Sequence, residues 1–90
     1  MNTSTFDELE CVRGMELAFS ADSLICTLDD GRVISVPLSY YPRLLRATDA
    51  QRRDFQWIAD GIGIHWPQLD EDLSIRGFLL GRIAPGGERR

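Results

Sequence analysis

Three short runs of alternating apolar and polar residues between Gly14 and Leu38 restrict what this chain can fold into more than any other feature. A period of two places one apolar set on one sheet face, as a half-buried antiparallel strand requires. Asp30-Gly31, between the second and third runs, is a pair that tolerates the positive φ of a tight hairpin turn. The pattern predicts a three-stranded antiparallel meander. The side chains expected to face inward are Met15, Leu17, Phe19, Leu24, Cys26, Leu28, Ile34, Val36 and Leu38.

The period changes at Pro42, a residue that suits the first turn of a helix because no backbone N–H is needed there. We expect a short helix over 42–47, with Leu44 and Leu45 facing the core. Thr48 and Gln51 match a capping box, in which the side chain of each residue bonds the backbone N–H of the other. A second short helix is therefore predicted from Asp49 to about Phe55.

A second hairpin is expected next, in which strand 56–59 pairs with strand 63–66 across the turn at Asp60-Gly61. The segment 69–72 is interpreted as an acidic connector, whose Asp70 or Asp72 caps a final helix over 74–80. Leu79 and Leu80 are expected to pack inward, and Gly81 to end that helix. The fold class is predicted as α+β: a three-stranded antiparallel meander, a short helical connection, a second hairpin and a short C-terminal helix.

The length of 90 residues leaves room for one small core. We expect a flexible N-terminus over 1–11, a single domain over 12–81 and a flexible tail over 82–90. The first ten residues are polar and acidic, unlike a signal peptide, and there is no run of eighteen apolar residues. These observations indicate a cytoplasmic protein without a membrane segment. Cys11 and Cys26 belong to no metal or redox motif and are interpreted as structural thiols, with a disulfide or a reactive thiol as alternatives.

The charge balance argues against a surface that follows nucleic-acid phosphates. All ten basic residues are arginine, and they face fourteen acidic residues, for a net charge of −4. A local basic patch is still possible, because four arginines fall within eleven positions. We interpret them as a solvated helix face, with an anion or nucleic-acid contact as the alternative. The four are Arg43, Arg46, Arg52 and Arg53.

His65, the only histidine, is followed within seven positions by Asp70, Glu71 and Asp72. A histidine with carboxylates can bind a transition metal or act as a base. A hydrogen-bonded structural histidine is the simpler interpretation, because one histidine is a thin basis for a zinc site. No phosphate-binding loop or nucleophile elbow is present. The sequence therefore predicts neither an enzyme nor a cofactor or metal site, and it names no catalytic residue.

Several motifs together resemble a small bacterial family, domain-of-unknown-function family 2442 (DUF2442). The resemblance extends from about Val12 to Gly81, and it is most specific in two segments whose spacing is part of the match. They read Gly-Ile-His-Trp-Pro at 63–67 and Leu-Asp-Glu-Asp at 69–72. The resemblance implies an α+β domain in a bacterial cytoplasm. It also implies a neighbouring gene for a small partner protein, in a presumed toxin–antitoxin pair in which this domain is the antitoxin candidate.

The leading hypothesis is a non-catalytic, antitoxin-like protein-interaction module that binds a small partner protein encoded nearby. A homodimer through an exposed sheet edge is also plausible. The alternatives are a ligand- or metal-binding domain around His65 with Asp70 and Asp72, and a DNA-associated regulatory protein, although nucleic acid is disfavoured by the charge. The residues expected to meet a partner or to shape its site are Arg43, His65, Trp66, Asp70 and Asp72.

Overall fold

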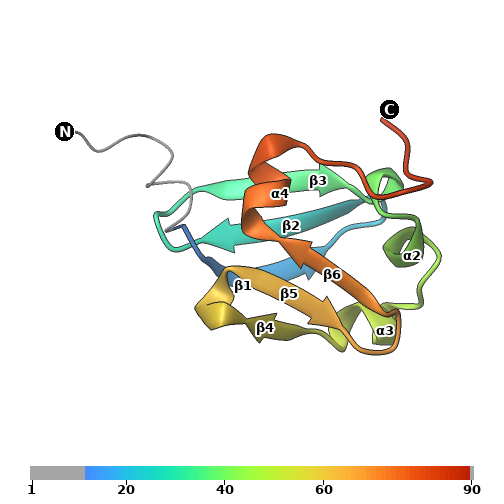
Figure 1. Cartoon of the computed structure of the whole chain (residues 1–90), viewed down its shortest axis with the longest axis horizontal. Helices are drawn as coiled ribbons and strands as arrows, with labels where there is room; N and C mark the ends of the chain where they lie inside the picture. The colour runs from blue at the N-terminus through green and yellow to red at the C-terminus, as the bar shows by residue number, and fades with distance from the viewer. Residues whose placement is uncertain (1–11, 90) are drawn as a thin grey trace.

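The protein consists of two three-stranded antiparallel sheets joined by short helices, as a computed structural model describing residues 12–89 shows (Figure 1). The α+β class predicted from the sequence is thereby confirmed. The predicted flexible segment 1–11, with Cys11, lies outside the described residues. No helix within residues 12–89 has the length and apolar character needed to cross a membrane. The elements are β1 (Gly14–Phe19), β2 (Ser23–Leu28), β3 (Val33–Pro37), η1 (Leu38–Tyr40), α2 (Pro42–Leu45), α3 (Asp49–Arg53), β4 (Gln56–Ile58), η2 (Ala59–Gly61), β5 (Gly63–Trp66), β6 (Glu71–Ser74) and α4 (Ile75–Leu80).

The first sheet is the predicted meander, with strand order β1-β2-β3 and one irregularity. The register places Gly14 opposite Leu28 and Glu16 opposite Thr27, so Met15 is an extra residue in a β-bulge. Met15 was predicted to face the core, but the bulge turns its side chain outward and leaves it 61% exposed. Gly14 is buried in its place, directly under the ring of Trp57.

The second sheet has three strands, in the order β4-β5-β6, where the sequence predicted a two-stranded hairpin and an acidic connector. β6 begins within that connector, because Glu71 pairs with Trp66 and Asp72 pairs with His65 along β5. Neither Asp70 nor Asp72 caps the last helix. Ser74 does so, with its hydroxyl accepting the backbone N–H of Gly77.

The helices follow the predicted signals at their ends better than along their faces. Thr48 and Gln51 form the predicted capping box, and α3 ends at Arg53 rather than near Phe55. Leu44 is fully buried, whereas Leu45 is 44% exposed because α2 is a single turn with one inward position. In α4 the fully buried residues are Ile75 and Phe78. Leu79 packs against the core as predicted and is partly buried, whereas Leu80 was predicted to pack inward and is 49% exposed. Gly81 ends that helix in the left-handed conformation, as predicted.

One core lies between the inner face of the first sheet, β5 of the second sheet and α4, which crosses in front of the first sheet in Figure 1. The approach of the sheets requires glycine at Gly61, where φ is +95° and a Cβ would lie 2.7 Å from the carbonyl oxygen of Gly14. The core residues are Val12, Leu24, Cys26, Leu28, Val36, Leu38, Tyr41, Leu44, Ile64, Trp66, Ile75 and Phe78.

The segment after Gly81 returns to the body of the domain and bonds to η1. The amide of Ala84 donates to the carbonyl oxygen of Tyr40 at 3.0 Å, and the amide of Glu88 donates to that of Ser39 at 2.8 Å. The hydroxyl of Ser39 donates in turn to the carbonyl oxygen of Glu88. The segment that was predicted as a flexible tail therefore has defined hydrogen-bond partners. Its flexibility stays a prediction, which amide exchange can measure.

We predict that Gly87→Ala will detach this segment, because a Cβ at Gly87 would clash with the backbone carbonyl of Tyr40. The amides of Ala84 and Glu88 should then exchange with deuterium faster than in the parent, while the core strands keep their protection. Pro85→Ala, in the same segment, is the matched control. Unchanged protection at both amides in the Gly87 variant would show that these bonds do not hold the segment.

Candidate functional site

His65 and Asp72, two of the residues singled out by the sequence, face each other across β5 and β6. The Nδ1 atom of His65 lies 2.5 Å from the Oδ1 atom of Asp72. The Asp72 side chain is 68% exposed, so solvent screens the pair, and such exposed pairs contribute at most about 1 kcal/mol. The arrangement is that of a cross-strand pair on the outer face of a sheet, which supports the structural interpretation of His65.

Arg43 reaches from α2 to the turn before β6, where its Nη1 atom donates to the backbone carbonyl of Asp70. Asp70 has a φ of +51°, a left-handed conformation that aspartate tolerates better than most residues. Within residues 12–89 no three His, Cys, Asp or Glu side chains are placed to hold one metal ion. The structure therefore brings His65 and Asp72 together without making Asp70 a further ligand.

Trp66 is completely buried, so it shapes the site from inside instead of meeting a partner. Its indole Nε1 donates to the carbonyl oxygen of Arg52 at 2.9 Å, which attaches α3 to β5. Its ring also lies 6.2 Å from that of Phe55, measured between centroids. Trp66 thus fixes the position of α3 and of the chain that follows it.

Two of the four clustered arginines are used to hold the helices in place. The Nε and Nη2 atoms of Arg52 donate to the carbonyl oxygens of Leu44 and Leu45 at 2.8 and 2.9 Å. Its Nη1 atom lies 3.7 Å from Asp49. Arg43 is likewise bonded to backbone, as described above. The four arginines therefore do not form one solvated basic face, which weakens the DNA-associated alternative.

The sequence named Glu71 as one of the acidic residues after His65 but did not select it as a site residue, because its segment was interpreted as a connector. As part of β6 it lies opposite the buried Trp66 and is half-buried itself. Burial raises its pKa above the ordinary glutamate value, although the nearby Arg43 opposes the shift. Glu71 and Tyr41 help to line a hollow of about 250 Å³ between β6, α4 and the C-terminal segment. Burial, Tyr40 and Glu71 raise the pKa of the Tyr41 hydroxyl.

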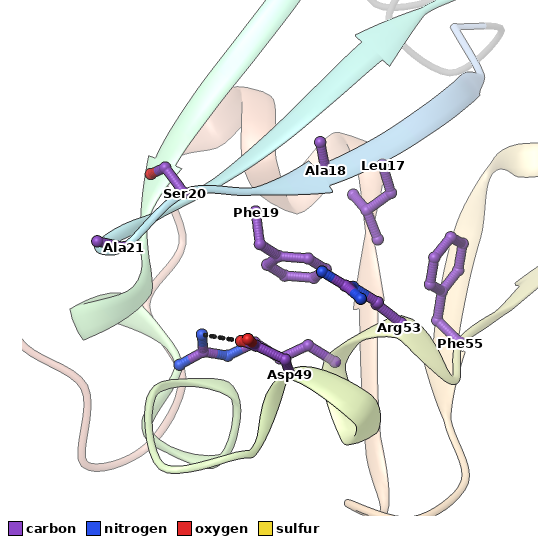
Figure 2. Close-up of a pocket in the computed structure, with 9 residues that line it drawn as sticks. Leu17, Ala18, Phe19, Ser20, Ala21, Asp49, Arg53 and Phe55 are labelled. Carbon is purple, nitrogen blue, oxygen red and sulfur yellow. Dashed lines mark ion pairs between the residues drawn. The ribbon is translucent and has the colours of Figure 1, made fainter.

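A larger hollow of about 590 Å³, which we call the β1 groove, lies between the end of β1 and the chain from α3 to Phe55 (Figure 2). Arg53 extends into it from α3, with Phe19 and Phe55 on either side in this view. The sequence offered no signal for this groove, because its two walls are about thirty residues apart along the chain. The lining residues are Leu17, Ala18, Phe19, Ser20, Ala21, Asp49, Arg52, Arg53 and Phe55.

A family model described as "Protein of unknown function (DUF2442)" matches residues 15–84. The chain belongs to the DUF2442 family. The match includes β1 from Met15 onward, all the residues that line the β1 groove and the β5–β6 pair, so these features lie in the family's own domain. None of the curated proteins matches this chain.

Two solved structures resemble this DUF2442 domain. A protein of unknown function from Rhodospirillum rubrum, seen in a crystal structure, is 27% identical over 81% of this chain and 90% of its own, with a TM-score of 0.70. An uncharacterized protein from Chromobacterium violaceum, seen by solution NMR, is 22% identical over 80% of this chain and 68% of its own, with a TM-score of 0.67. The second likeness shows a shared fold alone.

We predict that Trp66→Phe will lower the free energy of unfolding by about 2–4 kcal/mol, because it removes the bond to the Arg52 carbonyl and leaves a cavity. Urea denaturation followed by circular dichroism measures the change. Trp57→Phe, at a half-buried position of β4, is the matched control. An equal loss of unfolding free energy in the two variants would mean that the bond to Arg52 does not contribute measurably to stability.

We predict that Glu71→Gln will be more favourable for stability at pH 7 than at pH 4. A carboxyl with a raised pKa in the folded state stabilises fully below its ordinary pKa, and this contribution is lost as the pH rises through the raised value. Glutamine carries no such group, so the variant's advantage over the parent should grow across this window. Denaturation at both pH values measures it, with Glu16→Gln on exposed β1 as control. A constant difference would contradict the assignment.

Proposed function

We propose that this chain is a non-catalytic protein-interaction module, antitoxin-like, which binds a small partner protein encoded beside it in a bacterial genome and acts in the cytoplasm. The β1 groove is the observation that carries this proposal. It is an open hollow on the molecule's side, and it combines the apolar walls of Leu17, Phe19 and Phe55 with the exposed Arg53. Aromatic and arginine side chains are the residues that most often anchor protein interfaces.

The distribution of exposed apolar side chains supports the same proposal. Met15 on β1 and Val33 on β3 are each 61% exposed, and Ile58 on β4 is 43% exposed. All three lie on strands at the edges of their sheets. Edge strands with apolar side chains are the elements through which sheets recruit another chain. A partner that covers part of these edges would remove apolar surface from water.

The position of His65 favours a binding role over catalysis. Its ring is paired with Asp72 on the outer face of the second sheet, and it is not among the residues that line the β1 groove. A general base has to reach the proton that it removes from a bound substrate. The β1 groove and the histidine therefore lie apart, whereas an interaction module has no need to combine them.

We predict that the product of the adjacent reading frame will copurify with this chain when the two are expressed together. The complex should elute from gel filtration as a single species, with a mass that corresponds to a defined stoichiometry of the two proteins. Arg53→Glu in the β1 groove should reduce capture, and Arg46→Glu, an exposed arginine outside that groove, is the matched control. A chain that folds and never retains that product would overturn the proposed function.

A further inference from the structure

The β1 groove exposes the edge of a strand and not only one of its faces. Five consecutive residues, 17–21, line it. Successive side chains of a strand point to opposite faces, so a hollow on one face would meet every second residue. Leu17, Ala18 and Phe19 belong to β1, and Ser20 and Ala21 to the turn after it. A hollow that meets all three consecutive strand residues lies along the hydrogen-bonding edge of β1. Because the strand order is β1-β2-β3, this edge has no neighbouring strand in the first sheet.

The register of the hairpin shows which backbone groups point into the groove. The amide of Ser20 donates to the carbonyl oxygen of Ser23, which closes the β1–β2 hairpin. In an antiparallel ladder, residues bonded to the partner strand alternate with residues that point away from it. Ala18, opposite Ile25, therefore bonds to β2, whereas Leu17 and Phe19 direct their N–H and C=O groups outward. These two residues supply the donors and acceptors that an added strand needs.

The charge of the groove selects the kind of strand. Arg52 and Asp49 pair with each other at 3.7 Å, and the remaining donors of Arg52 are bonded to Leu44 and Leu45. Arg53 is exposed and extends into the groove, so it leaves one positive charge beside the free edge. In a chain with a net charge of −4, this is a local reversal of sign. Such a site favours a segment with negative charge.

We infer that the β1 groove binds an extended, acidic segment of the partner protein as an additional strand beside β1, with a carboxylate of that segment facing Arg53. This inference rests on the proposed function and names the part of the partner that is recognised. Main-chain bonds to Leu17 and Phe19 supply the pairing, and the apolar walls formed by Phe19 and Phe55 contact the side chains of the segment. Arg53 sets the preference for acidic sequences.

The test uses the full chain labelled with ¹⁵N and a defined probe, an acetylated and amidated heptapeptide in which glutamate alternates with threonine and valine. The expected result is a saturable shift of the amide resonances of Leu17, Phe19 and Arg53. A matched peptide with lysine in place of glutamate should bind at least about tenfold more weakly. In an extended peptide, alternate amides point to the same side. N-methylation of the set that points toward β1 should abolish binding without altering charge, whereas N-methylation of the other set should not.

Arg53→Glu should weaken binding of the acidic peptide by about tenfold or more, whereas Arg46→Glu should change it less than about twofold. Two results would overturn the inference: equal affinity for the acidic and lysine peptides, or shifts confined to residues outside 17–21 and 53–55. A third result would also overturn the inference. If ultracentrifugation shows that the free chain is a dimer, and hydrogen exchange shows that this dimer protects the amides of Leu17 and Phe19, a second copy of the chain occupies the edge.

The peptide and copurification experiments separate the two proposals. If the acidic peptide binds in the groove and the adjacent gene product is not retained, the strand-addition site stands and the antitoxin-like function falls. If the gene product is retained equally well by the parent and by Arg53→Glu, the function stands and the groove is not its docking site. Retention that is lost with Arg53→Glu and kept with Arg46→Glu supports both.

Discussion

The arrangement depends on how the carbonyl groups at the ends of α2 and α3 are satisfied. These helices have four and five residues, far below the length at which a helix is stable by itself. Their last carbonyl groups have no partner within the helix. The guanidinium of Arg52 bonds those of Leu44 and Leu45, and the indole of Trp66 bonds that of Arg52 itself. Two side chains thus join both helices to each other and to β5.

This arrangement explains why neighbouring arginines differ in use. Successive residues of a helix point about 100° apart, so Arg52 and Arg53 cannot both face α2. Arg52 turns inward and donates hydrogen bonds to backbone carbonyl groups, whereas Arg53 is exposed beside the end of β1. The buried Trp66, which no partner can touch, determines where this exposed charge stands. Its part in a binding site is therefore to place the wall of the groove.

Local patterns predicted the elements whose causes are local. The capping box at Thr48, the helix end at Gly81 and the alternation that gives the meander depend on residues close in sequence, and each was found. The errors depend on tertiary contacts. Met15 lies outside the core because the β-bulge turns it outward and places Gly14 under the ring of Trp57. The segment of β6 is a strand because it pairs with β5.

The candidate site divides in the same way. The proximity of His65 to a carboxylate could be expected from seven residues of separation and was found with Asp72, although the pairing across two strands was not foreseen. The β1 groove could not be predicted, because nothing in the sequence of 17–21 names Arg53 and Phe55 as its neighbours. The free edge of β1 differs between its two halves. Its first half carries the bulge and Glu16, devices that discourage unwanted pairing, whereas Leu17–Phe19 is regular and uncharged. A strand edge that is protected along one half and open along the other can accept one segment in one register.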